Sequence, residues 1–251
     1  MTSLTPETLL ELFDDVGRAV ASAVGAMTAD ERQEPGGRPT QYALDLVADE
    51  AALRVLEKAP VAVVSEESGR GGTEAAEVVV VLDPVDGSSN CSRGNPYWST
   101  SLAAVDGDGL LAAMVVSHTI GATYTAVRGG GSRLNDQRLG TPAVRPLDDA
   151  IVAAAWADRL QQRTWGGLRI LGSAALELCE VAAGSLDGWV DAVGILAPWD
   201  YLGALLVCRE TGVTVIEHQG RELVETSGDA RRQLVASASP ELLTALQASV
   251  P

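Results

Sequence analysis

Asp83 and Asp86 are the residues whose type and spacing say most about chemistry, because they follow directly on the unbroken apolar run Val78–Leu82. Such a run is typical of a strand covered on both faces, and the ends of buried strands in α/β folds open onto ligand crevices. Pro84 restricts the backbone between the two carboxylates and so holds them near one another. Two close carboxylates repel each other, and a hard divalent cation such as Mg²⁺ or Mn²⁺ removes that repulsion.

The residues that follow could complete a site of this kind. Gly87, Ser88 and Ser89 offer free backbone N–H groups and hydroxyls at an expected helix start, which suits an anion. The backbone carbonyl of Val85 could add a ligand to the metal. Metal-binding carboxylates beside a phosphate cradle indicate phosphoryl transfer to water, whereas the alternative interpretation of the string 83–90 is a polar turn.

Three further acidic residues could extend the site, and each has a simpler interpretation. Glu66 follows a second short apolar run and could be a metal ligand or part of a solvated loop. Asp200 is expected to cap a helix over 201–210, while its second oxygen could bind metal. Asp49 lies inside an expected helix over 40–58, where an exposed position is the alternative.

The elements that must position these residues form two parts of different character. Before residue 147 the pattern predicts helices with an antiparallel sheet, and after it strands and helices alternate. We therefore predict the α/β fold class, with an α+β N-terminal part over 1–146 and an α/β C-terminal part over 147–251, packed tightly together. Helices are expected at 6–27, 40–58, 173–183, 201–210 and from 240 onward, strands at 61–64, 78–82, 98–105, 110–119, 123–127, 151–155, 169–171, 186–190, 213–216 and 234–236, and loops at 35–39 and 69–77.

The composition excludes several classes of function. The chain has 34 acidic and 18 basic residues and a formal net charge of −16, so we expect neither nucleic acid nor a membrane as a partner. A phosphate substrate would also be repelled unless metal ions lay between. Lys58 is the only lysine, which leaves Schiff-base and P-loop chemistry almost without a candidate, and the 2 histidines exclude a multi-histidine zinc site.

Cysteine usage and the N-terminal residues indicate a cytoplasmic protein. The 3 cysteines show no CxxC spacing and are expected to be reduced thiols. The first residues lack the basic region of a secretory signal, and no apolar run approaches the ~20 residues that a membrane span needs.

The string 83–90 resembles the Asp-Pro-Ile-Asp-Gly-Thr-x-Asn signature of the inositol monophosphatase family. This family belongs with fructose-1,6-bisphosphatases and bisphosphate nucleotidases in a superfamily of metal-dependent, lithium-sensitive phosphatases. Further motifs match in order: Leu46-Val47-Ala48-Asp49 the helix aspartate, Ser65-Glu66-Glu67-Ser68 the Glu-Glu-Ser, Gly172-Ser173-Ala174-Ala175 the Gly-Ser-Ala-Ala, and Trp199–Ala204 with Glu210–Gly212 the second signature. The resemblance spans most of the chain and implies a layered αβαβα sandwich.

The resemblance also implies a metal centre with two or three Mg²⁺ ions, for which Mn²⁺ could substitute. One ion would be bound by Glu66, Asp83 and the carbonyl of Val85, and the second by Asp83, Asp86 and Asp200, with Asp83 bridging. A third ion would lie near Glu66.

The roles that the resemblance implies around the substrate come from four segments. Catalysis would depend on Asp49, Ser88 and Glu66, with the first two polarising the attacking water. The phosphate would lie against Gly87, Ser88 and Ser89, and the alcohol against Gly172, Ser173 and Ala174. Asp191 is the candidate for the acid that binds a sugar or inositol hydroxyl, although it lies further from Asp200 than is usual.

Three departures from the family pattern bear on substrate choice. Ser88 replaces the usual threonine and keeps its hydroxyl, whereas Cys91 stands where an aromatic residue normally follows the asparagine. The lysine usual in the mobile loop near the metals has no counterpart, and Arg38 is the nearest cation.

These observations predict a Mg²⁺-dependent phosphomonoesterase that acts on inositol 1-phosphate or a related polyol phosphate and forms a homodimer. The alternatives with the same chemistry are histidinol phosphate, fructose 1,6-bisphosphate and adenosine 3′,5′-bisphosphate. An inactive interaction module is a different class and predicts a lost metal ligand, yet all five expected acids are present: Asp49, Glu66, Asp83, Asp86 and Asp200.

Overall fold

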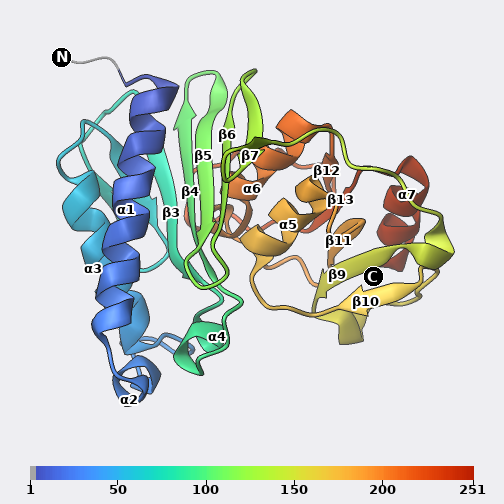
Figure 1. The fold of residues 1–251 in the computed structure, drawn as a ribbon, viewed down its shortest axis with the longest axis horizontal. Helices are drawn as coiled ribbons and strands as arrows, with labels where there is room; N and C mark the ends of the chain where they lie inside the picture. The colour runs from blue at the N-terminus through green and yellow to red at the C-terminus, as the bar shows by residue number, and fades with distance from the viewer. Residues whose placement is uncertain (1–3) are drawn as a thin grey trace.

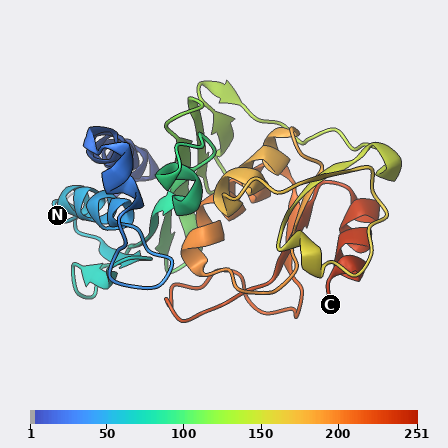
Figure 2. The same cartoon turned by 90° about the horizontal axis from the view of Figure 1, so that it is seen from below.

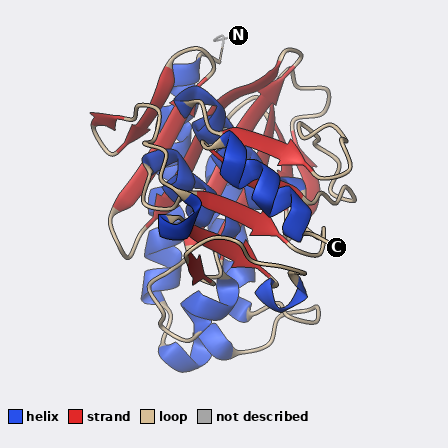
Figure 3. Cartoon of the chain, turned by 90° about the vertical axis from the view of Figure 1, so that its right-hand side faces the viewer, coloured by secondary structure: helices blue, strands red, loops and turns tan. Residues whose placement is uncertain are grey.

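The computed structural model describes residues 4–251 and arranges them in five layers. α1 and α3 cover the outer face of a first sheet, α5 and α6 lie between this sheet and a second one, and α7 covers the outer face of the second (Figure 1). Figure 2 shows α5 and α6 between the two sheets from below, and Figure 3 views the molecule from the side of α7. The predicted αβαβα sandwich is confirmed.

The first sheet has eight strands in the order β2-β1-β3-β4-β5-β6-β7-β8. Only β1 and β3 pair in parallel, and the other neighbours are antiparallel. The strands are β1 (Ala62–Ser65), β2 (Gly69–Gly72), β3 (Val79–Asp86), β4 (Ser99–Asp106), β5 (Gly109–Ser117), β6 (Ala122–Val127), β7 (Gly131–Leu134) and β8 (Gln137–Arg138).

One loop prediction and one strand boundary in this sheet were wrong. β2 lies in the segment 69–77, which was expected to be a loop, because its pairing with β1 comes from backbone hydrogen bonds and its glycine-rich, exposed residues show no hydrophobic alternation. β3 does not end at Leu82 but continues to Asp86, with its register shifted between Asp83 and Asp86. The two acids therefore lie on the strand itself.

The second sheet has five strands in the order β10-β9-β11-β13-β12, and β9 pairs in parallel with both neighbours. Its strands are β9 (Ile151–Ala155), β10 (Gly167–Arg169), β11 (Gly188–Asp191), β12 (Thr214–Glu217) and β13 (Leu234–Ser237). β10 starts two residues before the predicted 169–171.

Most helices lie where the sequence predicts them, but the helix expected at 40–58 spans Ala43–Leu56 and the short helix Ala29–Gln33 was not predicted. Thr5 caps the first helix, since its hydroxyl accepts the N–H of Thr8 at 3.3 Å and Pro6 follows at the first helical position. No helix among residues 4–251 is long and apolar enough to cross a membrane. The helices are α1 (Pro6–Ala26), α2 (Ala29–Gln33), α3 (Ala43–Leu56), α4 (Ser88–Ser92), α5 (Ala174–Ala183), α6 (Pro198–Thr211) and α7 (Pro240–Ser249), with single 3-10 turns at Leu147–Asp149 and Ala157–Arg159.

The middle layer joins the two sheets. α6 is buried on nearly every face and packs against β4 and β5 of the first sheet and β12 of the second, while α5 contacts β5 and β11. α5 and α6 belong to the C-terminal part and yet cover the N-terminal sheet. The division of the chain into two parts at residue 147 stays a prediction.

The seating of α6 on the first sheet depends on Gly203. A Cβ atom at this position would lie 2.8 Å from the Ser101 Oγ and 3.2 Å from the Leu102 carbonyl oxygen. We expect Gly203→Ala to lower the free energy of unfolding by about 1–3 kcal/mol, as overpacking does in cores. Urea denaturation followed by circular dichroism measures this change.

Gly25→Ala in α1 is the matched control, because nothing lies within 4 Å of a Cβ atom there. It is expected to raise the free energy of unfolding by about 0.5–1 kcal/mol through helix propensity. Equal effects of the two substitutions would contradict the close approach of α6.

Candidate active site

Three carboxylates from separate elements converge at one point of the structure. Glu66 follows β1, Asp83 lies in β3 and Asp200 lies in the first turn of α6. One oxygen from each lies within 4.8 Å of the oxygens of the other two. Because β1 and β3 are parallel neighbours, their ends bring Glu66 and Asp83 side by side.

These carboxyl groups resist being charged together without a cation. Burial, followed by the charges of three neighbouring acids, raises the pKa of Asp83 well above its usual value. Burial and the charge of Glu67 raise the pKa of Glu66 to about 7, and burial and the charge of Glu66 raise the pKa of Asp200. All the donors are carboxylate oxygens, which suit a hard divalent cation. The residues present therefore fit the predicted Mg²⁺.

The place of Asp200 in its helix differs from the prediction. α6 begins at Pro198, not at Tyr201, so Asp200 is the third helical residue and not the cap. Its Oδ2 accepts the N–H of Ala197 at 2.7 Å, so this third helical residue satisfies the backbone donor of the residue before the helix. Proline at the first helical position was the signal for this earlier start.

Asp86 is held by the N-terminus of α5. Its Oδ2 accepts the hydroxyl of Ser173 at 2.6 Å and the N–H of Ala175 at 2.9 Å, and its Oδ1 accepts the N–H of Ala174 at 3.3 Å. Burial raises the pKa of Asp86 to about 6 in spite of these donors. Ser173 also lies 3.1 Å from the Ser99 hydroxyl and is fully buried, so its hydroxyl positions Asp86 and is not free for the alcohol pocket.

The water-polarising role predicted for Asp49 fits Asp45 better. Asp49 is buried, and its Oδ1 accepts the hydroxyl of Ser65 at 2.5 Å. Asp45, one helical turn earlier, lines the same cavity as Glu66 and Ser88, and its buried Oδ1 has no partner among the described residues. Burial raises the pKa of Asp45 to about 6. Both acids lie on one face of α3, and only the tertiary structure shows which turn meets the site.

The predicted phosphate cradle forms a tight turn into α4. Gly87 has a φ of 98°, and a Cβ atom there would lie 3.0 Å from the carbonyl oxygen of Gly172. In the first turn of α4 the N–H groups of Asn90 and Cys91 donate to the Gly87 carbonyl at 2.9 and 3.0 Å, so only those of Ser88 and Ser89 lack a partner inside the helix. The Ser88 hydroxyl donates to the Val85 carbonyl at 3.0 Å, and the Ser89 hydroxyl lies 3.4 Å from the Tyr42 hydroxyl.

Two residues without an assigned role hold this turn against the C-terminal part. The Asn90 side-chain amide donates to the carbonyl of Tyr97 at 2.7 Å and to that of Leu171 at 2.8 Å. The buried Glu177 accepts N–H groups from Leu171 at 2.8 Å, Gly172 at 3.1 Å and the Trp189 indole at 2.6 Å. A glutamate among the apolar residues Ala175–Cys179 of α5 was the signal that could have found it.

Asp191 does not occupy the position predicted for it. Its side chain is fully buried and accepts the backbone N–H groups of Val193, Gly194 and Ile195 at 2.9, 3.0 and 3.3 Å. Because both oxygens hold its own loop, the expected contact with a substrate hydroxyl is not supported.

Two cavities border the acids. The larger, of about 610 Å³, contains Asp45, Glu66 and Ser88 together with exposed arginines from separate segments. The smaller, of about 330 Å³, contains Asp86 and Asp200 together with the predicted Gly172, Ser173 and Ala174. The arginines of the larger cavity are Arg38, Arg70 and Arg231.

The structure also places Arg38 and Cys91, which belong to two of the three departures from the family pattern. Arg38 pairs with the carboxylate of Glu67 and donates to the Glu66 carbonyl at 3.3 Å, so it fastens the loop before α3 to the metal-binding segment. Cys91 is buried beside Trp98 in the core under α1 and lines neither cavity that holds the acids.

Comparison with known sequences identifies the family. The model of the inositol monophosphatase family matches residues 6–250. The chain belongs to this family. It is 33% identical to the fructose-1,6-bisphosphatase/inositol-1-monophosphatase of Methanothermobacter thermautotrophicus, over 93% of this chain and 91% of the relative. It is 32% identical to Nus factor SuhB of Pasteurella multocida, over 78% of this chain and 76% of that protein.

A solved structure agrees with this membership at the level of the fold. A hypothetical protein of Pyrococcus horikoshii with similarities to inositol-1 monophosphatase has a TM-score of 0.88 at 24% identity, over 98% of this chain and 100% of that one. The resemblance drawn from the motifs is thus confirmed. As a member of the inositol monophosphatase family, the chain belongs with phosphatase-type hydrolases that generally use divalent metals.

The acidic cluster predicts how metal removal changes stability with pH. Without metal, the folded protein keeps a proton on Glu66 up to about pH 7, whereas the unfolded chain releases it near the ordinary value of 4.5. The folded state then binds more protons than the unfolded state, so raising the pH between these values lowers stability. In EDTA, we expect the melting temperature to fall from pH 5 to pH 7, and Mg²⁺ to restore it at pH 7.

Differential scanning fluorimetry measures this effect, and Glu66→Gln is the control, because its amide does not titrate. A melting temperature in EDTA that does not change between pH 5 and pH 7 would contradict the buried cluster.

Glu177 provides a second test, directed at the support of the cradle. Burial raises its pKa to about 7, and its two oxygens accept three N–H groups. Glu177→Gln sets an amide NH₂ against one of those donors, and we expect a loss of about 1–3 kcal/mol in the free energy of unfolding. Urea denaturation measures it, with Glu241→Gln on the exposed face of α7 as a control expected to change little.

Proposed function

We propose that the protein is a Mg²⁺-dependent phosphomonoesterase that releases phosphate from a small phosphorylated alcohol, with inositol 1-phosphate and related polyol phosphates as the first substrates to test. The observation that carries this proposal is the convergence of Glu66, Asp83 and Asp200 next to the Gly87 turn. Carboxylates that gather metal ions beside backbone N–H groups suit the hydrolysis of a phosphate ester.

The family resemblance supplies the proposed division of ligands between two ions. Glu66, Asp83 and the Val85 carbonyl would hold one ion, and Asp83 would share a second with Asp86 and Asp200. When bound, such ions supply Lewis-acid activation of water and neutralise charge on the phosphoryl oxygens. They also shield the substrate from a chain whose formal net charge is −16.

The chain's own residues would accept the proton of water and orient the phosphate. Asp45 lines the cavity that contains Glu66 and Ser88, and its carboxylate would accept the proton of the attacking water. The N–H groups that open α4 would orient the phosphate at Ser88 and Ser89.

The inactive interaction module has less support. A relative bears the name Nus factor SuhB, which describes that protein. This chain keeps each carboxylate that the proposed hydrolase needs. Burying these acids together costs folding free energy, so a role in stability alone does not explain the cluster. The homodimer, the cytoplasmic location, lithium sensitivity and the lack of nucleic-acid or membrane partners stay predictions.

Asp83→Asn tests the proposed function most directly. It removes the charge shared by the two ions, and we expect phosphate release in Mg²⁺ to fall by about 10³-fold or more, as when a major source of transition-state charge stabilisation is lost. The assay compares inositol 1-phosphate, histidinol phosphate, fructose 1,6-bisphosphate and adenosine 3′,5′-bisphosphate, with and without Mg²⁺.

Asp108→Asn, in the exposed turn after β4, is the matched control and should keep full activity. Retained turnover in Asp83→Asn, with its fold verified by circular dichroism, would refute the two-metal arrangement.

A further inference from the structure

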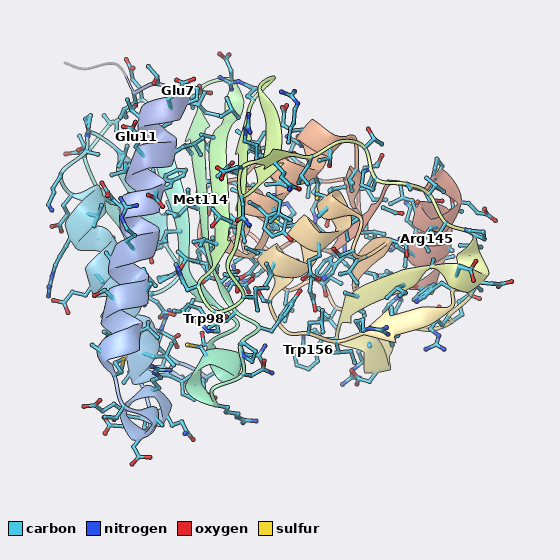
Figure 4. All side chains as sticks on the ribbon, viewed as in Figure 1. Glu7, Glu11, Trp98, Met114, Arg145 and Trp156 are labelled. Carbon is cyan, nitrogen blue, oxygen red and sulfur yellow. The ribbon has the colours of Figure 1, made fainter. Side chains whose placement is uncertain are left out.

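A third cavity lies apart from the two that border the acids. It has a volume of about 280 Å³ and is lined by the last two turns of α1, by α2, by α4 with the segment after it, and by the residues that follow β5. It shares no lining residue with either cavity that contains the acids. Figure 4 shows Trp98, which belongs to its lining, beside α4 at the lower end of the first sheet. A ligand bound here would therefore occupy a place separate from the phosphate ester.

Two aromatic rings form one wall of this cavity. The ring centroids of Trp98 and His118 lie 5.3 Å apart, with the ring planes tilted by 53°. The Thr100 hydroxyl donates to the Pro84 carbonyl at 2.8 Å, so its oxygen accepts the N–H of His118 Nε2 at 3.1 Å, which holds the imidazole in place. Burial lowers the pKa of His118 to about 4, so the imidazole is uncharged at pH 7. A fixed, uncharged aromatic wall suits a planar ring, which packs on it in an offset or edge-to-face arrangement.

Arg32 is the only charged residue in the lining that the structure describes. Its Nε atom is buried without a hydrogen-bond partner, and its guanidinium forms no ion pair with an acid of residues 4–251. A buried donor without an acceptor is unfavourable, and a guanidinium binds a carboxylate through two parallel hydrogen bonds. No acid lines this cavity, in contrast to the other two, so an organic anion could enter it without a metal ion.

Cys91 leaves room for a ligand. Its side chain is buried under α1 beside Trp98 and lines the cavity, at the position where the family pattern has an aromatic residue. Because a thiol is smaller than an aromatic ring, part of the volume that such a ring would take stays open. Burial raises the pKa of Cys91 to about 11, against the lowering effect of the Arg32 charge, so the thiol is uncharged and does not repel an anion.

We propose that this cavity is a second ligand site, which binds a small carboxylic acid that carries a planar apolar ring. The ring would pack against Trp98 and His118 on one side and Val24 of α1 on another, and the carboxylate would pair with Arg32. The volume of about 280 Å³ lies near the lower end of small-molecule sites, which suits a ligand of one or two rings. This site is independent of the phosphatase chemistry, because none of its residues belongs to the acidic cluster.

Isothermal titration calorimetry with 2-naphthoate, on the full chain in Mg²⁺, tests the proposal. The matched ligand is 2-naphthylmethanol, which carries the same ring without the charge. We expect one naphthoate to bind per chain, about tenfold or more tighter than the alcohol. Arg32→Gln should lower the affinity for naphthoate by about tenfold or more and leave the affinity for the alcohol nearly unchanged.

Arg70→Gln is the matched control, because Arg70 lines the larger of the two acidic cavities, and it should leave both affinities unchanged. Cys91→Phe places a ring in the cavity and should abolish the binding of both compounds. Circular dichroism verifies the fold of each variant, and Arg32→Gln decides the matter if Cys91→Phe does not fold.

Three results would overturn the proposed site. The first is a wild-type chain that binds neither compound at millimolar concentration. The second is an affinity for naphthoate that Arg32→Gln leaves unchanged. The third is a loss of binding in Arg70→Gln with binding retained in Arg32→Gln, which would place the acid in the larger cavity.

Discussion

The mutual repulsion of buried carboxylates is the constraint on which the rest of this structure depends. Burial raises the pKa of Glu66, Asp83 and Asp200, and the charges of neighbouring acids, Asp86 among them, raise it further. Left to themselves, these side chains would turn away from each other or take up protons. The fold prevents the first outcome by fixing the carboxylates through their neighbours, and a divalent cation would remove the need for the second.

Each support comes from a different layer of the sandwich. The N-terminus of α5 binds Asp86, the first turn of α6 fixes Asp200, and the parallel pair β1 and β3 sets Glu66 beside Asp83. The cradle for the phosphate is likewise shared, because Asn90 and Glu177 fasten the Gly87 turn to the Gly172 segment. The site therefore forms only where the two sheets and the helices between them meet. Substitutions far from the acidic cluster can displace its side chains through packing.

The sequence predicted the elements well wherever side-chain burial determines them. The run Val78–Leu82 predicted the buried part of β3, although not its continuation to Asp86, and the cap at Thr5 and the stop at Gly212 appear as expected. It failed where backbone geometry decides, as in β2, whose glycine-rich residues pair through their amides alone. The predicted roles of some acids were also wrong, because their partners lie far away in the chain or in a loop whose shape the sequence does not show. Asp191, for example, accepts hydrogen bonds from its own loop.

The sequence by itself determined the α/β class, the family and the acids that can bind metal, because these depend on residue type and local spacing. Only the tertiary structure decided that Asp45 and not Asp49 faces the cavity, since both lie on one side of α3 a single turn apart. The tertiary structure alone showed that the Ser173 hydroxyl donates to Asp86 and that Trp156, Ile170 and Ile195 line one cavity. Local spacing fixes the face of an element on which a side chain lies, whereas its partner depends on how distant elements pack.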